Sequence, residues 1–130
     1  MKVELSLGDV VDKISILQIK SKKMSDPSKR RNVERELRAL TMAWQEEAYP
    51  DLEALPQWEA LLQVNQKLWG VEDDLRMLER QQDFGERFVL LARSVYFLND
   101  QRAALKRSIN DLLGSTLVEE KLYPDYQDRC

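Results

Sequence analysis

The chain has 130 residues, a net charge of −3 and a single cysteine, Cys130. With 43% hydrophobic and 33% charged residues, its composition is that of a folded globular protein and excludes a disordered one. No apolar run approaches the roughly 18 residues that a membrane-spanning helix needs. Glu4 and Asp9 interrupt the apolar stretch that a signal peptide would require. Because one cysteine cannot form a disulfide within the chain, we predict a cytoplasmic protein.

Hydrophobic residues recur every three or four positions through most of the chain, which is the spacing of amphipathic helices. Side chains that favour helix N-termini stand at Ser6, Asp26 and Asp83. Pro50 and Gly114 stand where helices are expected to stop. The pattern predicts four helices and a C-terminal arm, over residues 7–25, 27–49, 56–81, 84–113 and 115–130.

The apolar stripes repeat every seven residues, the spacing at which helices pack nearly antiparallel. Short connectors pair the first helix with the second and the third with the fourth. We therefore predict an all-α, antiparallel four-helix bundle, built from two helical hairpins in one domain over residues 1–130. Residues 2–7 and 115–123 alternate in polarity, which predicts short extended arms, lying over the bundle or paired with each other. Gly70, inside the third helix, predicts a close helix contact.

The residue types on which most enzymes and metal sites depend are scarce. The chain has no histidine, the commonest general base and metal ligand. It also lacks the glycine-rich loops that bind phosphate and the ExxE and ExxD pairs of helical magnesium-dependent pyrophosphohydrolases. We predict no metal site, no cofactor and a function that is not catalytic.

Arg102 occupies a core-facing position in the otherwise apolar stripe of the fourth helix. One interpretation is a buried ion pair that fixes the register of the helices, with a polar partner on the third helix. The alternative is a pocket for an anion, which Arg102 would line together with Lys106 and Asn99. The candidate partners on the third helix are spaced by seven residues: Asn65, Glu72 and Glu79.

Positive charge is concentrated between Lys20 and Arg38, a segment that contains eight cationic and three acidic residues. A solvated face is the first interpretation. The alternatives are a docking surface for an acidic partner and weak binding of a phosphate-rich polymer. Specific nucleic-acid recognition ranks last, because no aromatic residue in the segment offers a stacking platform for bases. The core of this candidate basic surface is Lys29, Arg30, Arg31 and Arg35.

The long second hairpin carries more heptad-spaced apolar residues than one partner helix can cover. We predict that it binds a second copy of the chain, as a dimer, or another protein. A non-catalytic interaction or scaffolding module is therefore the first functional hypothesis.

Three segments resemble one protein family, the DUF6165 family of small bacterial proteins. They are LGDVVDKISILQIK, LERQQDFGERFVLLARSVYFLNDQRAALKRSIN and LLGSTLVEEKLY, within a similarity running from about Leu5 to Tyr123. The resemblance implies a bacterial cytoplasmic protein, sometimes met beside genes for envelope polysaccharides. It also implies that a family site would use the polar residues of these segments, namely Asp12, Lys13, Asp83, Asn99, Asp100, Arg102, Lys106, Arg107, Asn110, Glu119, Glu120 and Lys121. With Asp12 and Lys13 added to the predicted pocket, the candidate anion- or partner-binding residues are Arg102, Lys106, Asn99, Asp12 and Lys13.

The segment VVDKISILQIKSKK also resembles the first helix of the all-α chorismate mutases. That resemblance implies a small enzyme, or a binding protein for an anionic metabolite, that works through arginine and lysine. The first helix here has lysines but no arginine, and it therefore lacks the bidentate carboxylate clamp found in that family. The anionic-metabolite site is kept as an alternative hypothesis.

Overall fold

The computed structural model describes residues 1–120 and places most of them in helices. The elements in chain order are α1 (Leu7–Lys23), α2 (Pro27–Glu46), the 3₁₀ turn η1 (Leu52–Ala54), α3 (Trp58–Arg80) and α4 (Glu86–Leu113). The predicted all-α fold of four helices in two hairpins is confirmed. α2 ends at Glu46, earlier than predicted, because the chain turns back there and the Trp44 indole N–H donates to the Pro50 carbonyl at 2.9 Å.

Two of the three predicted N-terminal caps are confirmed, at Ser6 and Asp26. The Ser6 hydroxyl accepts the Asp9 N–H at 3.2 Å at the start of α1. The Asp26 carboxylate accepts the Ser28 N–H at 2.9 Å at the start of α2. The prediction that Asp83 caps the fourth helix is wrong, because Gly85 occupies that position and Asp83 accepts its N–H at 3.1 Å.

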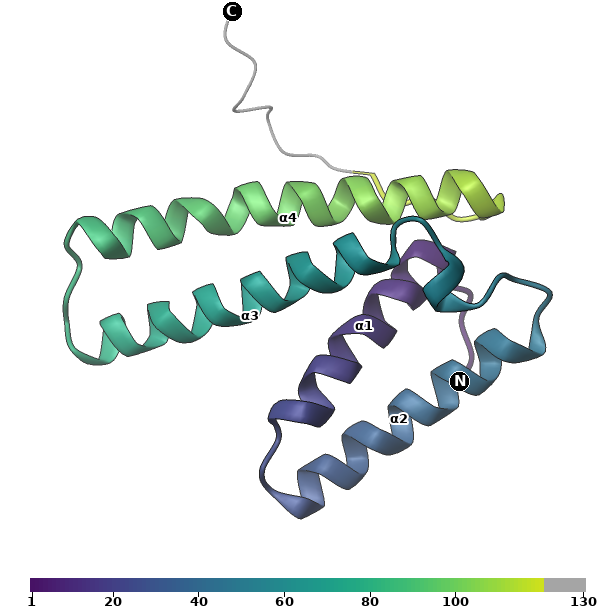
Figure 1. Ribbon diagram of the computed structural model, residues 1–130, viewed down its shortest axis with the longest axis horizontal. Helices are drawn as coiled ribbons and strands as arrows, with labels where there is room; N and C mark the ends of the chain where they lie inside the picture. Colours follow the sequence, from purple (N-terminus) through teal and green to yellow (C-terminus); the bar gives the residue numbers. More distant parts are fainter. Residues whose placement is uncertain (121–130) are drawn as a thin grey trace, which may run out of the picture.

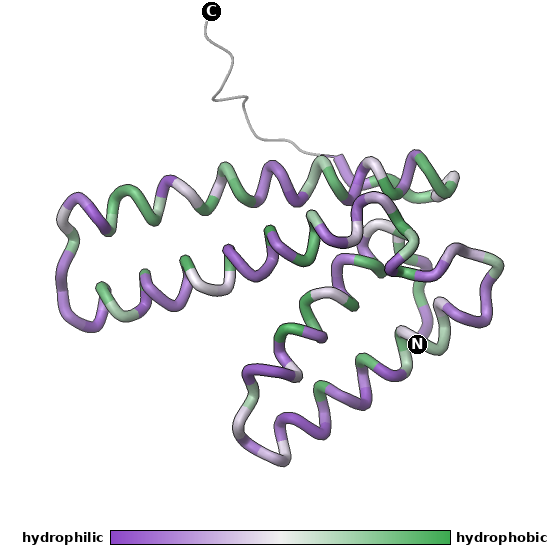
Figure 2. Tube along the Cα trace, in the orientation of Figure 1, coloured by the Kyte–Doolittle hydropathy of each residue, from purple (hydrophilic) through white to green (hydrophobic). Residues whose placement is uncertain are grey.

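The two hairpins lie at an angle to each other and meet at one end, as Figure 1 shows. α3 and α4 form the long hairpin. α1 packs against both of them, whereas α2 packs mainly against α1. Hydrophobic residues continue along both long helices to the far end of their hairpin, beyond the part that α1 covers (Figure 2). None of the helices within residues 1–120 is long and apolar enough to cross a bilayer.

The core lies where the start of α1, the end of α2, the start of α3 and the end of α4 come together. Ile14, Leu61 and Ile109 are fully buried at its centre, and each comes from a different helix. Its remaining buried members are Val11, Trp44, Leu52, Leu55 and Trp58. The connection between α2 and α3 therefore contributes apolar side chains to the core rather than serving only as a loop.

The two arms lie side by side near this end of the molecule. Thr116 donates its hydroxyl to the Glu4 carboxylate at 2.6 Å, and the Leu7 N–H donates to the Ser115 hydroxyl at 3.1 Å. Between residues 1 and 120 these segments are extended but form no strand, so the arms meet through side chains rather than a backbone ladder. The rest of the predicted C-terminal arm, 121–130, lies outside the described residues.

The predicted close contact at Gly70 is wrong, because a β-carbon there would have no neighbouring atom within 4 Å. The close approach is at Gly8 instead. A β-carbon on Gly8 would overlap the backbone carbonyl of Lys106 and lie 3.0 Å from the side-chain oxygen of Asn110. Only glycine lets the first turn of α1 rest directly on the backbone of α4.

Candidate functional site

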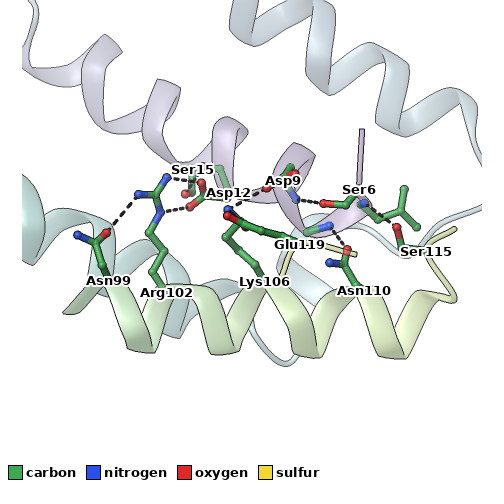
Figure 3. Close-up of polar contacts among 12 residues, drawn as sticks. Ser6, Asp9, Asp12, Ser15, Asn99, Arg102, Lys106, Asn110, Ser115 and Glu119 are labelled. Atoms are coloured by element: carbon green, nitrogen blue, oxygen red, sulfur yellow. Dashed lines mark hydrogen bonds and ion pairs between the residues drawn. The ribbon is translucent and has the colours of Figure 1, made fainter. Parts of the chain in front are cut away.

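A cluster of polar side chains lies between α1 and α4 (Figure 3). The term "polar cluster" is used for Asp9, Asp12, Ser15, Asn65, Arg102, Lys106, Asn110 and Glu119. At its centre Arg102 binds Asp12 through two hydrogen bonds. Nε donates to Oδ1 at 2.9 Å and Nη2 donates to Oδ2 at 2.5 Å, the bidentate geometry that makes arginine–carboxylate pairs strong and directional.

The buried Asp12 carboxylate is surrounded by further hydrogen bonds. The Asn65 amide on α3 donates to Asp12 Oδ1 at 3.0 Å and to the Ser15 hydroxyl at 2.8 Å. Ser15 in turn donates to the Asp12 backbone carbonyl at 2.7 Å. The Asp12 side chain is only 6% exposed, and such a charge is tolerated in a core only when it is paired and hydrogen-bonded. The hydrogen bonds that Arg102 donates to Asp12 raise the pKa of Arg102 and outweigh the lowering effect of burial, so Arg102 stays cationic.

Lys106, one helical turn beyond Arg102, joins two carboxylates. Its Nζ lies 2.8 Å from Asp9 Oδ1 and 2.7 Å from Glu119 Oε2, and its side chain is 13% exposed. Burial lowers the pKa of Lys106, but hydrogen bonds to both carboxylates outweigh it, and the net shift is upward. Burial raises the pKa of Asp9, but hydrogen bonds from Lys106 and Ser6 outweigh it, and the net shift is downward. Each partner therefore holds the other in its charged form.

The far end of the polar cluster secures the start of α1. The Gly8 N–H donates to the Asn110 side-chain oxygen at 2.6 Å, which satisfies one of the N–H groups that every helix N-terminus leaves without a partner. Asn110 is 2% exposed and sits in the last turn of α4. The contact is possible because Gly8 allows the two helices to approach so closely.

The comparisons with known proteins identify one family. A family model described as a family of unknown function, DUF6165, matches residues 1–126. The chain belongs to the DUF6165 family. No curated protein and no solved structure matches this DUF6165 chain.

The structure brings together four of the five residues predicted to form an anion or partner site. Asp12, Arg102 and Lys106 belong to the polar cluster, and the Asn99 side-chain oxygen accepts from Arg102 Nη1 at 3.5 Å at its edge. Lys13 does not join them. It pairs with Glu36 on α2 at 3.2 Å, on the exposed side of the first hairpin.

The predicted partner of Arg102 on the third helix is wrong, because Arg102 pairs with Asp12 on α1, and Asn65 of α3 donates to the same carboxylate. Glu72 lies instead beside Arg76 on its own helix, 3.9 Å away. The carboxylate that pairs with Arg102 is on α1, and neither composition nor spacing along α3 could indicate it. A signal did exist, because Asp9 and Asp12 are one turn apart on the first helix, as Lys106 and Arg102 are on the last.

The other residues that the family resemblance implied lie in several different places in the DUF6165 chain. Asn110 and Glu119 belong to the polar cluster, and Arg107 pairs with Glu120 at 3.0 Å beside it. Asp83 lies far away, in the turn of the long hairpin. Asp100 is on α4, two residues before Arg102. Lys121 lies outside the described residues.

The polar cluster is suited to holding helices together. Arg102 and Lys106 each bind carboxylates of the chain itself, and Asp9 and Asp12 are engaged by these cations. Within residues 1–120 no three Asp, Glu, His or Cys side chains converge as metal ligands would. The exposed features of this DUF6165 chain are elsewhere, on the far half of the long hairpin and on α2.

The candidate basic surface lies at the turn of the first hairpin and along α2. Lys29, Arg30, Arg31 and Arg35 are all exposed there. Arg30 pairs with Glu34 one turn away at 3.1 Å. In the segment from Lys20 to Arg38, Arg30 is the one cation for which residues 1–120 supply an ion-pair partner.

Proposed function

We propose that the chain is a non-catalytic protein–protein interaction module that binds a second copy of itself through the far half of the long hairpin. This surface is called the distal hairpin and comprises residues 70–97. The observation that carries the proposal is the exposure of large apolar side chains on it. Met77 is 52% exposed, Phe84 49%, Val89 49% and Leu90 56%.

These side chains are exposed because two helices alone cannot enclose an apolar stripe on each of them. α1 covers the long hairpin only near the end opposite its turn (Figure 1). The buried residues of α4, Ile109 and Asn110, are found at this end. On the α3 part of the distal hairpin, Leu78 is the one buried side chain. Near the turn Phe84 packs edge-on against Phe88, with ring centroids 5.1 Å apart, and still leaves half of its surface in water.

A second copy is the occupant that these features favour. Two hairpins packed face to face would complete a four-helix arrangement, for which the seven-residue spacing of the stripes is suited. A two-fold dimer places the same patch against itself, so a surface that is apolar at its centre is self-complementary. Two ion pairs within the hairpin, Arg76 with Asp73 at 3.4 Å and Arg87 with Asp74 at 3.5 Å, reduce the charge that two copies would bring together.

Light scattering across a dilution series tests this proposal, with one charged substitution on the distal hairpin and one elsewhere. The wild-type chain is expected to have the mass of a dimer that dissociates on dilution. Leu90→Glu is expected to give a monomer at every concentration, because it would bury an unpaired carboxylate in the interface. Met42→Glu is the matched control, since Met42 on α2 is also 52% exposed and lies outside the distal hairpin. A wild-type chain that is monomeric throughout, or a Met42→Glu chain that dissociates equally, would contradict the proposal.

The alternative of a site for an anionic metabolite has less support. Arg102 and Lys106, the cations that such a site would use, are already bound to Asp12, Asp9 and Glu119. A role in an envelope-polysaccharide pathway and a cytoplasmic location stay predictions from the sequence.

A further inference from the structure

Two kinds of cation can be distinguished in this protein by their surroundings. Arg102 and Lys106 are half-buried and bind carboxylates that hold α1 against α4. The cations from Lys20 to Arg38 are exposed, except for the half-buried Lys20, and apart from Arg30 they have no ion pair with any residue from 1 to 120. The term "basic surface" is used for Lys20, Lys22, Lys23, Lys29, Arg30, Arg31, Arg35 and Arg38.

The acids of the same segment do little to neutralise the basic surface. Asp26 caps α2 through the N–H groups of Ser28 and Lys29. Glu36 is engaged by Lys13, which is not part of the basic surface. Only Glu34 forms an ion pair with a residue of the basic surface, Arg30. Most of the positive charge is thus left to solvent or to a partner.

The placement of these cations on α2 is unfavourable for the helix itself. Lys29, Arg30 and Arg31 are the third to fifth residues of α2. The first turn of this helix contains no acidic residue. The positive end of the helix macrodipole lies there, and it favours acids and disfavours cations. Helix stability does not explain this placement, whereas binding of an anion does.

The exposed face of α2 also has a regular pattern. Arg31, Arg35 and Arg38 are three or four residues apart, so they share one face of the helix, and all three are exposed. Met42 continues the same face one turn further on and is 52% exposed. α2 packs mainly against α1, which leaves this ridge of arginines ending in a methionine uncovered along the helix.

We propose that the ridge of Arg31, Arg35, Arg38 and Met42 binds an acidic helical segment of another protein. Each arginine guanidinium can bind one carboxylate through two hydrogen bonds. Carboxylates spaced one helical turn apart on a partner helix would match the spacing of the arginines on α2. Methionine is a flexible apolar contact of the kind used at adaptable peptide-binding surfaces. A long nucleic acid fits less well, because Glu46 follows on the same face and the whole chain carries a charge of −3. This surface lies on the other hairpin from the one proposed for self-association, so either proposal can fail alone.

Fluorescence anisotropy with a synthetic probe tests the proposal. The probe is a labelled helical peptide of about 18 residues with glutamates on one face, long enough to span the ridge at about 1.5 Å per residue. A second peptide has the same composition with its glutamates spread around the helix. A short DNA duplex is the third ligand. Binding of the first peptide to the wild-type chain is expected to be the tightest and to weaken as salt is added.

The variant Arg31→Glu/Arg35→Glu/Arg38→Glu is expected to weaken peptide binding about tenfold or more. The matched control is Lys2→Glu/Lys67→Glu/Arg107→Glu, which makes the same change of charge at exposed cations outside both the ridge and the distal hairpin. It is expected to change the affinity by less than about twofold. The proposal is overturned if the wild-type chain does not bind the peptide, or if the control weakens binding as much. Tighter binding of the duplex than of the peptide would overturn it in favour of a phosphate-polymer surface.

Discussion

Arg102 and Asp12 join the last helix of the chain to the first through two parallel hydrogen bonds of 2.9 and 2.5 Å. The two residues are 90 positions apart, and only the completed fold brings them together. Because the pair is bidentate, α1 cannot shift along α4 by one residue without breaking both bonds. The pair therefore fixes the register of the two hairpins at the place where they meet.

The first prediction concerns the free energy of unfolding of variants at this pair. Arg102→Met leaves the buried Asp12 carboxylate with Asn65 as its main hydrogen-bond donor, and we expect a loss of about 2–4 kcal/mol. The value is placed towards the lower end because the Arg102 side chain is 29% exposed. Asp12→Leu/Arg102→Met removes both charges, and we expect it to recover much of that loss. Urea unfolding measures all of these variants, with Asp12→Leu completing the cycle; effects that simply add would show that the residues are not coupled.

The second prediction compares Gly8, where two helices approach closely, with Gly70, where the sequence predicted a close contact. Gly8→Ala places a methyl group against the backbone carbonyl of Lys106, which cannot rotate away, and we expect a loss of about 1–3 kcal/mol. Gly70→Ala adds a methyl group in open space inside α3, and we expect a gain of about 0.5–1 kcal/mol from helix propensity. Thermal unfolding of both variants checks the signs. Equal effects at the two positions would contradict the close contact of α1 with α4.

The comparison of these glycines shows what sequence periodicity can and cannot reveal. Periodicity placed the helices and their pairing, because each helix buries one apolar stripe that is visible within its own residues. The close helix contact was predicted at Gly70, a glycine inside a helix, and not at Gly8, near a helix end. The close contact depends on where two helices cross, and the crossing point is set by residues of both.

The same reasoning applies to the polar cluster. Arg102 could be recognised from the sequence because a charge in an apolar stripe needs a partner. Asp12 was a candidate residue, but its pairing with Arg102 was not predicted, because the pairing depends on how α1 crosses α4. Glu119 was harder still, since its role depends on the arm turning back over Lys106. The apolar surplus of the long hairpin, in contrast, was visible in the sequence as a property of its own residues.

The third prediction is a pH dependence that Lys106 controls. The pKa of Asp9 is lowered from 3.8 in the folded protein, so its stabilising contribution is present above 3.8 and is lost as the pH falls through the folded value. The pKa of Lys106 is raised from 10.5, so its contribution is present below 10.5 and is lost as the pH rises through the folded value. We therefore expect the difference in unfolding free energy between wild type and Lys106→Met to be largest between these limits and to shrink outside them.

Urea unfolding at several pH values from acid to alkaline measures that difference. Arg107→Met is a suitable control, because Arg107 is the neighbouring cation and pairs with Glu120 on the exposed surface. Its effect is expected to be small throughout. A difference between wild type and Lys106→Met that stays constant with pH would show that only the aliphatic part of Lys106 stabilises the fold.

The fourth prediction is that two charge reversals at the start of α2 make the protein more stable. Lys29→Glu and Arg31→Glu replace cations near the positive end of the helix macrodipole with acids, which that end favours. Both side chains are exposed and have no ion pair within residues 1–120, so little is lost. We expect Lys29→Glu to gain about 0.3–1 kcal/mol and Arg31→Glu to gain less, since the effect fades beyond the first turn. Thermal unfolding at low salt measures the gain, and added salt should reduce it.

The result bears directly on why the cations are there. If these charge reversals stabilise the chain and also lower its affinity for an acidic peptide, the cations contribute to binding and reduce the stability of the helix. Lys67→Glu serves as the control, because Lys67 is an exposed cation in the interior of α3, away from either helix end. If Lys29→Glu lowered the stability, or raised it no more than Lys67→Glu, the cations at the start of α2 would not be unfavourably placed, and the argument that they are kept for a partner would lose that support.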